Sequence, residues 1–363
     1  MSNACERRCR ELLAQFVDPH SGLDLVAAGA LEGVAADGDR VAVDVLLPYP
    51  AATWTSTLAA ELRHFLEADP LIAAATVNVR WRVYAHRVQK ELTPLPNVRN
   101  IIAVASGKGG VGKSTAAANL ALALQAEGAR VGILDADIYG PSQPRMMGVS
   151  GKPESKDGKS IEPMIGHGVQ VMSIGFLIEE DTAMIWRGPM VSQALQQLLN
   201  DTRWVDLDYL VIDLPPGTGD IQLTLCQRVP VSGALIVTTP QDIALLDAKK
   251  GLKMFEKVEV PGLGIIENMA VHTCSECGHS EHIFGSGGGA SMASQYQVPL
   301  LGSLPLARHV REQADGGTPT VIAAPDSLSA QVYREIARKA AARLSMQARN
   351  KKIAMPSIVI SDS

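Results

Sequence analysis

The sequence is poor in the features that define several large classes of protein. Its net charge is −5 at pH 7, so it has no excess of basic residues for a nucleic-acid surface. No apolar run approaches the ~18 residues that a membrane-spanning helix requires. Residues 1–16 carry charges where a secretory signal would be apolar. We therefore expect a soluble, cytoplasmic protein without nucleic-acid or membrane partners.

Cysteine is also scarce, and the odd count of 5 argues against a framework of disulfides. This usage fits a reducing compartment. Cys5 and Cys9 lie four residues apart on a predicted helix, and Cys226 lies in an apolar segment; all three are typical of core thiols. Cys274 and Cys277 form the C-x-x-C pair and need a separate explanation.

A glycine-rich segment, GKGGVGKS at 107–114, is the most informative feature that is present. It follows the apolar run 101–105, typical of a buried strand, and precedes a predicted helix at 115–127. It fits the phosphate-binding pattern G-x-x-x-x-G-K-[ST], whose amides suit an anion at a helix start. Lys113 suits the outer phosphates and the Ser114 hydroxyl suits Mg²⁺. The predicted nucleotide-binding residues are Gly107, Lys108, Gly109, Gly110, Val111, Gly112, Lys113, Ser114 and Thr115.

Acidic residues end two of the predicted strands that follow. Asp135 and Asp137 close one strand and Asp213 closes another, and buried unpaired carboxylates are costly. An acid placed like Asp213 commonly holds Mg²⁺, so we predict a magnesium site here. The alternative for each acid is a helix cap or a loop charge. The next segment, PPGTGD at 215–220, suits a loop that senses the terminal phosphate.

The base of the nucleotide is indicated by the residue that follows the predicted strand at 262–267. A GTPase of this architecture would usually show an N-K-x-D run there, and this chain has N-M-A-V instead. Asn268 suits an adenine edge. The sequence therefore favours ATP over GTP.

The hydrophobic pattern divides the chain into two predicted domains. Residues 1–92 suit a small α+β domain, with helices at 5–16 and 53–67, the second capped by Thr53, and strands at 29–35, 40–47 and 75–84. Residues 93–99 form a proline-containing linker, 100–345 a P-loop ATPase domain, and 346–363 a flexible tail. In the larger domain strands alternate with helices, which predicts an α/β fold with a mostly parallel, doubly wound sheet and ligands at the strands' carboxyl ends. Its predicted strands are 101–105, 130–135, 169–174, 209–213, 234–238, 262–267 and 300–303.

The Cys274–Cys277 pair can bind one metal ion or one face of a metal cluster. Zinc remains an alternative, because three histidines could complete four ligands. A [4Fe–4S] cluster needs four thiolates, which two chains would supply across a twofold axis. The three histidines are His272, His279 and His282.

A series of motifs resembles the Mrp/ApbC family of iron–sulfur cluster carriers, ATPases of the MinD/ParA branch with a deviant phosphate loop. The resemblance covers 97–344, and more loosely the N-terminal module, which is similar to MIP18-like domains. The motifs are GKGGVGKS (107–114), LDADIYGPS (134–142), WRGPM (186–190), DLPPGTGD (213–220), TTPQDIALLDAKKG (238–251) and the C-x-x-C segment.

The resemblance implies a homodimer in which Cys274 and Cys277 of both subunits bridge a labile [4Fe–4S] cluster. It implies slow ATP hydrolysis coupled to taking clusters from an assembly scaffold and giving them to apo iron–sulfur proteins. Lys108 would reach the partner's nucleotide, Asp135 would lie near Mg²⁺, and Asp137 would orient the attacking water. Arg187 of WRGPM would neutralise phosphate or contact a client.

Two other functions remain open at this point. One is a zinc-binding metallochaperone ATPase. The other is a positioning scaffold like the cell-division ATPases, which need a C-terminal amphipathic membrane helix. The corresponding segment here, 351–356, is interrupted by Pro356.

Overall fold

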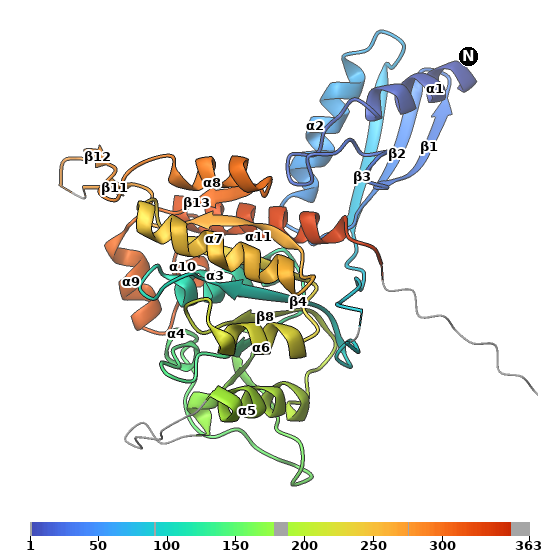
Figure 1. Ribbon diagram of the computed structural model, residues 1–363. Helices are drawn as coiled ribbons and strands as arrows, with labels where there is room; N and C mark the ends of the chain where they lie inside the picture. Colours follow the sequence, from blue (N-terminus) through green and yellow to red (C-terminus); the bar gives the residue numbers. More distant parts are fainter. Residues whose placement is uncertain (1, 91, 178–187, 275, 350–363) are drawn as a thin grey trace, which may run out of the picture.

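The computed structural model describes residues 2–90, 92–177, 188–274 and 276–349. Two units of secondary structure lie side by side, the first at the upper right in Figure 1. In it, β1 (Leu31–Asp37) pairs antiparallel with β2 (Arg40–Leu47), and β3 (Ala74–Trp81) adds parallel to β2. Two helices, α1 (Ser2–Leu13) and α2 (Thr55–Glu67), complete the predicted α+β fold.

Alternation along β2 explains why this small unit has a core. Every second residue of the strand, from Val41 to Leu47, is buried, as expected for a strand with one face in the core. Helix α2 buries Leu58, Leu62 and Leu66 at helical spacing. These two apolar faces hold the unit together.

The predicted cap of α2 is wrong. Trp54 occupies the N-cap position and makes no side-chain cap bond. Thr53 instead donates from its backbone nitrogen (3.0 Å) and its hydroxyl (2.6 Å) to the carboxylate of Glu127, in the larger unit. A tertiary partner has therefore replaced the local helix contact that the sequence suggested.

The larger unit contains an eight-stranded sheet in the order β13-β10-β9-β4-β8-β5-β7-β6. Its parallel pairing confirms the predicted α/β sheet, with the P-loop strand β4 at the centre. The edge strand β6 was not predicted; it pairs antiparallel with β7 and is three residues long. The strands are β4 (Val98–Ala105), β5 (Val131–Asp135), β6 (Met164–Gly166), β7 (Val169–Ser173), β8 (Leu207–Asp213), β9 (Gly233–Thr238), β10 (Gly262–Glu267) and β13 (Leu300–Ser303).

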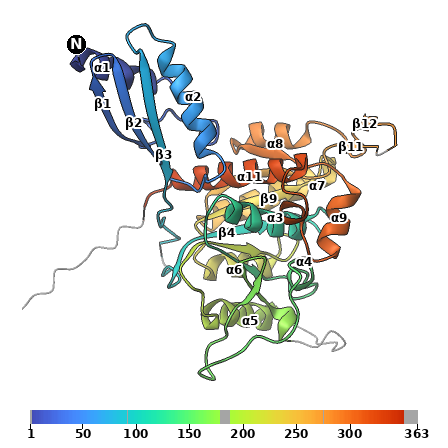
Figure 2. The same cartoon turned by 180° about the vertical axis from the view of Figure 1, so that it is seen from behind.

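Helices cover both faces of this sheet. In Figure 1 α6 and α7 lie in front of it, and the reverse view in Figure 2 shows α3 and α11, which pack together behind it. The helices are α3 (Lys113–Ala126), α4 (Gln143–Met146), α5 (Gly188–Asp201), α6 (Asp220–Arg228), α7 (Asp242–Lys257), α8 (Gly288–Tyr296), α9 (Arg308–Asp315), α10 (Thr320–Ala323) and α11 (Leu328–Ser345), with a 3-10 turn at Ile174–Phe176.

The two units meet at the end of α3 that is remote from the P-loop. Glu127, fully buried, receives a hydrogen bond from the Arg338 guanidinium (2.7 Å) in addition to those from Thr53. Arg338 also donates to His20 Nε2 (3.0 Å) and lies over the Trp54 ring at 5.5 Å. One arginine of α11 thus joins the P-loop helix to the N-terminal unit.

The first residues of the predicted tail are held against the chain that links the two units. The Arg87 nitrogen donates to the Ala348 carbonyl (2.9 Å), and the Arg349 guanidinium lies 3.8 Å from the centre of the Tyr84 ring. This differs from the prediction of a flexible segment for 346–349; residues 350–363 lie outside the described part of the chain. No helix among the described residues is long and apolar enough to cross a membrane.

Candidate functional site

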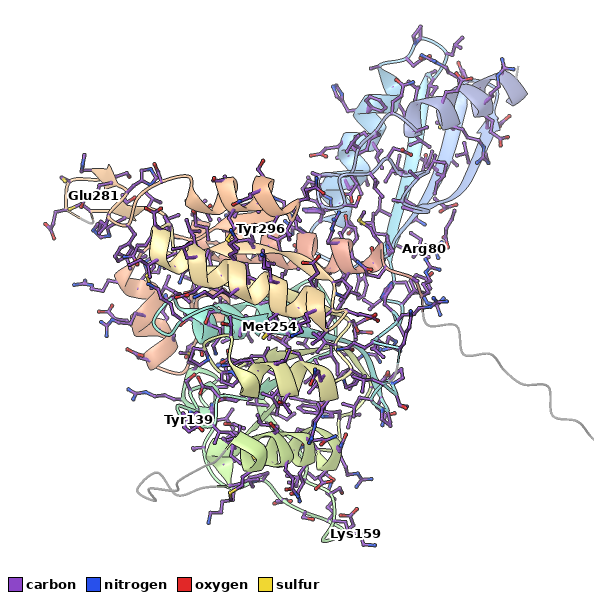
Figure 3. The ribbon with its side chains drawn as sticks, viewed as in Figure 1. Arg80, Tyr139, Lys159, Met254, Glu281 and Tyr296 are labelled. Carbon is purple, nitrogen blue, oxygen red and sulfur yellow. The ribbon has the colours of Figure 1, made fainter. Side chains whose placement is uncertain are left out.

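Four loops that carry the predicted site residues lie at one edge of the large sheet. They follow β4, β5, β8 and β10, which run parallel and therefore end at the same edge. Figure 3 shows Tyr139, in the loop after β5, and Glu281, in a hairpin after β10, on this same side of the molecule. The sheet thus brings the candidate residues together.

The phosphate loop is held in shape by three neighbouring segments. A Cβ added at Gly107 would lie 2.2 Å from the backbone carbon of Asp247, so α7 packs directly on the loop and only glycine fits. The Asn268 side-chain nitrogen donates to the Val111 carbonyl (2.8 Å). The Gly217 nitrogen, from the loop after β8, donates to the Ser106 carbonyl (2.9 Å). These contacts preorganise the loop for an anion.

Left-handed backbone conformations inside the loop explain two more of its glycines. Gly110 has φ +82° and Gly112, the N-cap of α3, has φ +83°. Residues other than glycine rarely adopt a positive φ, because their Cβ atom clashes with the backbone. At Gly112 an added Cβ would also lie 2.2 Å from the Asn268 amide.

Lys113 lies in the middle of the candidate site. Its side chain is 6 % exposed and forms an ion pair with Asp213, at the end of β8. Its ammonium is also 3.2 Å from the Ser114 hydroxyl. The phosphate-binding lysine, the hydroxyl and the carboxylate predicted for Mg²⁺ therefore form one cluster.

Asp135 is fully buried, and its carboxylate organises the loop after β5. It accepts hydrogen bonds from the nitrogens of Asp137 (3.1 Å), Ser142 (2.9 Å) and Gln143 (3.0 Å), and from the Ser173 hydroxyl (3.1 Å). Burial and the nearby Asp213 raise the pKa of this carboxyl. Four donors occupy its oxygens, so in this structure Asp135 holds the loop after β5. Its role near Mg²⁺ stays a prediction.

Asp137 and Lys108 line the same edge. Asp137 is half-buried, and burial raises the pKa of its carboxyl above the ordinary value. The Lys108 ammonium lies 3.4 Å from the side-chain oxygen of Gln241, at the start of α7. Gln241 was not predicted as a partner of Lys108, because a glutamine next to a helix start carries no distinctive pattern.

The cysteine pair lies in a small hairpin that projects beyond this edge of the sheet (Figure 1). Strands β11 (His272–Thr273) and β12 (Ser280–Glu281) pair antiparallel, and the turn between them is closed by a bond from the Cys274 nitrogen to the His279 carbonyl (2.9 Å). Cys274 is half-buried and Cys277 is exposed. The hairpin therefore presents two free thiols to solvent.

The turn activates one thiol. The backbone N–H groups of Cys277 and Glu276 point at the Cys274 sulfur and lower its pKa, because they stabilise the thiolate. Burial has the opposite effect elsewhere, raising the pKa of Cys9 to about 11 and that of Cys226 to about 12. Among these cysteines, therefore, only those of the hairpin have sulfur atoms accessible to solvent, and one of them, Cys274, has a lowered pKa.

This contrast predicts an order of alkylation. At pH 8 the lowered pKa gives Cys274 a larger thiolate fraction than an ordinary thiol, whereas Cys9 and Cys226 stay protonated and covered. We expect iodoacetamide to label Cys274 first and the two buried thiols last, measured by mass spectrometry of tryptic peptides over time. Equal rates at Cys274 and Cys226 would contradict this description of the hairpin.

The three histidines proposed for zinc do not converge with the cysteines. The Nδ1 atoms of His272 and His282 lie 3.1 Å and 2.6 Å from the carbonyls of Leu306 and Ala270. Across the described ranges, no three His, Cys, Asp or Glu side chains form a metal-binding group. Trp186 and Arg187 of the WRGPM motif lie outside the described residues, and Met190 is exposed on α5.

The central P-loop strand, the parallel sheet and the loops gathered at its edge define a P-loop NTPase of the ParA/MinD type. Comparison with protein families agrees: residues 97–341 match the family described as NUBPL iron-transfer P-loop NTPase, and 6–79 match the iron-sulfur cluster assembly protein family. The chain belongs to the iron–sulfur cluster carrier protein family, also known as Mrp, ApbC or NUBPL, and it is a carrier NTPase of that family.

Three relatives of this family cover between 69% and 92% of this chain. The iron-sulfur cluster carrier protein of Escherichia coli strain K12 is 52% identical, covering 92% of this chain and 91% of its own. That of Pseudomonas fragi is 62% identical over 73% of this chain and 93% of its own. The mouse iron-sulfur cluster transfer protein NUBPL is 50% identical over 69% of this chain and 79% of its own.

Solved structures resemble the larger unit. A nucleotide-binding protein from Archaeoglobus fulgidus in complex with ADP is 38% identical with a TM-score of 0.54, covering 61% of this chain and 87% of its own. The cell division ATPase MinD of Pyrococcus furiosus has a TM-score of 0.50 at 24% identity, covering 66% of this chain and 97% of its own, and shares the fold.

Proposed function

We propose that two copies of this chain bridge a [4Fe–4S] cluster through Cys274 and Cys277, and that binding and hydrolysis of ATP control its transfer to apo-proteins. The observation that carries this proposal is the hairpin itself. It offers two solvent-facing thiols, one with a lowered pKa, at the edge of the sheet that bears the phosphate loop. One chain supplies two thiolates and the cluster requires four, so a symmetric pair of chains completes the site.

ATP is the nucleotide that the site supports best. The amides of the phosphate loop and Lys113 would hold the phosphates, and the Archaeoglobus fulgidus relative was solved with ADP. In this structure the Asn268 nitrogen is bound to the phosphate loop, which leaves its side-chain oxygen as the atom for an adenine contact. Lys108 would release Gln241 and reach the nucleotide of the partner subunit.

The donor atoms near Lys113 fit Mg²⁺. The Ser114 hydroxyl and the Asp213 carboxylate are hard oxygen ligands in one cluster, and Mg²⁺ usually takes few protein ligands together with waters and phosphates. The ion would neutralise charge on the transferring phosphoryl group. Lys113 would then exchange Asp213 for the phosphates, while Asp137 accepts a hydrogen bond from the attacking water and aligns it with the γ-phosphorus.

ATP hydrolysis and cluster transfer would be coupled because both sites lie at the same edge of the large sheet. The loops that would contact the nucleotide and the hairpin that carries the cysteines all follow strands of the same sheet, β4, β5, β8 and β10. If two copies close over ATP at this edge, the hairpins approach one another, and hydrolysis would favour a form in which they separate. The clients would be apo iron–sulfur proteins and the donor a cluster-assembly scaffold.

Anaerobic reconstitution with iron and sulfide tests the proposal. We expect about four iron and four sulfide per pair of chains, a dimer by analytical ultracentrifugation, and loss of the cluster absorbance in Cys274→Ser and in Cys277→Ser. Cys226→Ala, which removes a buried core thiol, is the matched control and should retain the cluster. A cluster retained by both serine variants would refute the assignment, and so would zinc as the metal of protein purified without air.

A further inference from the structure

Gln143 connects the three segments that form the candidate magnesium site. It begins α4, in the loop after β5, and it is fully buried. Its backbone nitrogen donates to Asp135 (3.0 Å), and its side-chain nitrogen donates both to the Ser114 carbonyl (3.0 Å) and to the Asp213 carboxylate (2.9 Å). One residue thereby ties the first turn of α3 to the carboxyl ends of β5 and β8.

The orientation of this side chain follows from its partners. A carbonyl and a carboxylate only accept hydrogen bonds, so both must face the amide nitrogen of Gln143. The amide oxygen, Oε1, therefore makes neither of these two contacts. Within the described part of the chain Oε1 is buried without a hydrogen-bond partner, and so is the neighbouring Ser142 hydroxyl. Buried oxygens of this kind are unfavourable until a donor reaches them.

We propose that Gln143 is a positioning residue for the Mg²⁺–nucleotide complex. Its nitrogen holds the Asp213 carboxylate at a set distance from the first turn of α3, and its Oε1 accepts a hydrogen bond from a water of the Mg²⁺ hydration shell. Mg²⁺ keeps several waters when it binds with nucleotide, and outer-shell partners of this kind fix ligand geometry. The inference rests on the nucleotide site of the proposed function and is independent of the cluster.

Magnesium dependence separates this role from a purely structural one. A glutamine that only anchored α4 would matter equally with and without the ion, because its contacts to Ser114 and Asp213 exist in the protein alone. A glutamine that in addition accepts a hydrogen bond from the hydrated ion matters more when the ion is present than when it is absent. The gain in ADP affinity caused by Mg²⁺ is therefore the quantity to measure.

The experiment measures ADP binding to the full-length protein by calorimetry, in EDTA and in saturating MgCl₂. Gln143→Leu removes both polar atoms at similar volume, and Gln143→Asn keeps the amide but shortens its reach. Gln170→Leu is the matched control, since Gln170 also bonds through its amide, to the nitrogen and carbonyl of Val205 (3.0 and 2.9 Å), away from the site.

We expect the ADP affinity in EDTA to be unchanged in Gln170→Leu and to change less in the two Gln143 variants than their affinity in MgCl₂ does. In MgCl₂ the gain seen for the unsubstituted protein and for Gln170→Leu should fall by about ten- to a hundredfold in Gln143→Leu, and by less in Gln143→Asn. A full gain in both Gln143 variants, or a loss of equal size in EDTA, would overturn the inference. If the leucine variant does not fold, the asparagine variant decides. Failure of the unsubstituted protein to bind ADP would instead overturn the proposed nucleotide site.

Discussion

Lys113→Ala is expected to slow ATP hydrolysis by about 10²–10³-fold, the usual effect of removing one preorganised donor from a developing negative charge. The side chain is buried in the cluster with Asp213 and Ser114, where the low dielectric strengthens its interaction with phosphate. The substitution also leaves the buried Asp213 carboxylate without its ion-pair partner. Phosphate release at saturating ATP measures the first effect, and ADP binding by calorimetry shows the weakened phosphate site.

The control for this substitution is Lys250→Ala. Lys250 forms a pair with Asp247 (2.9 Å) on α7 and its side chain is 66 % exposed, so its removal takes away an exposed lysine that is not part of the cluster around Lys113. Its hydrolysis rate should match that of the unsubstituted protein. Equal rates for all three proteins would show that the phosphates do not bind at this loop.

Arg338→Met is expected to lower the free energy of unfolding by about 3–5 kcal/mol, because removing one partner of a buried ion pair leaves the other charge uncompensated. Glu127 is completely buried, and Arg338 is its only cation within 4 Å among the described residues. The same guanidinium contacts His20 and Trp54, so the N-terminal unit would loosen as well. Chemical denaturation followed by tryptophan fluorescence measures the change, with Trp54 reporting on the interface.

The adjacent residue provides a matched control. Lys339 pairs with Glu335 one turn earlier on the same helix, and both side chains are partly open to solvent; pairs open to solvent contribute about 0–1 kcal/mol. Lys339→Met should therefore shift the denaturation midpoint much less. Adding Glu127→Gln to Arg338→Met should recover part of the loss, since it removes the uncompensated charge. Midpoints that coincide for Arg338→Met and Lys339→Met would contradict a buried pair at this interface.

Glu127 links the phosphate loop to the N-terminal unit through helix α3. Helix α3 begins at Lys113, in the phosphate loop, and ends next to Glu127, which bonds Thr53 of the N-terminal unit. A displacement of α3 on nucleotide binding would therefore reach that unit through one rigid element. In Figure 1 the N-terminal unit and the cysteine hairpin lie at opposite ends of the molecule.

Much of the nucleotide site was predictable because its chemistry is contiguous in the chain. The glycines, Lys113 and Ser114 occur at a spacing that only a tight anion-binding turn requires, and the structure puts this turn between β4 and α3 as expected. Asp213 was recognisable as an acid at the end of an apolar run, and the structure pairs it with Lys113. The C-x-x-C pair needed no fold to be noticed, since its two sulfurs are two residues apart.

Contacts between segments far apart in sequence could not be predicted in this way. Thr53 is a residue type that often caps helices, yet its hydroxyl donates to Glu127. Asn268 suits contact with an adenine base, yet its side-chain nitrogen donates to the phosphate loop. Gln143 belongs to no residue type that signals a metal site. The local amino-acid sequence is enough to specify the phosphate loop, the acidic residues at strand ends and the thiol pair, because each is recognised from neighbours within a few residues. Which polar side chain meets which partner is decided only when the sheet brings distant loops to one edge, because buried donors and acceptors bond to whatever partner the packing places within reach.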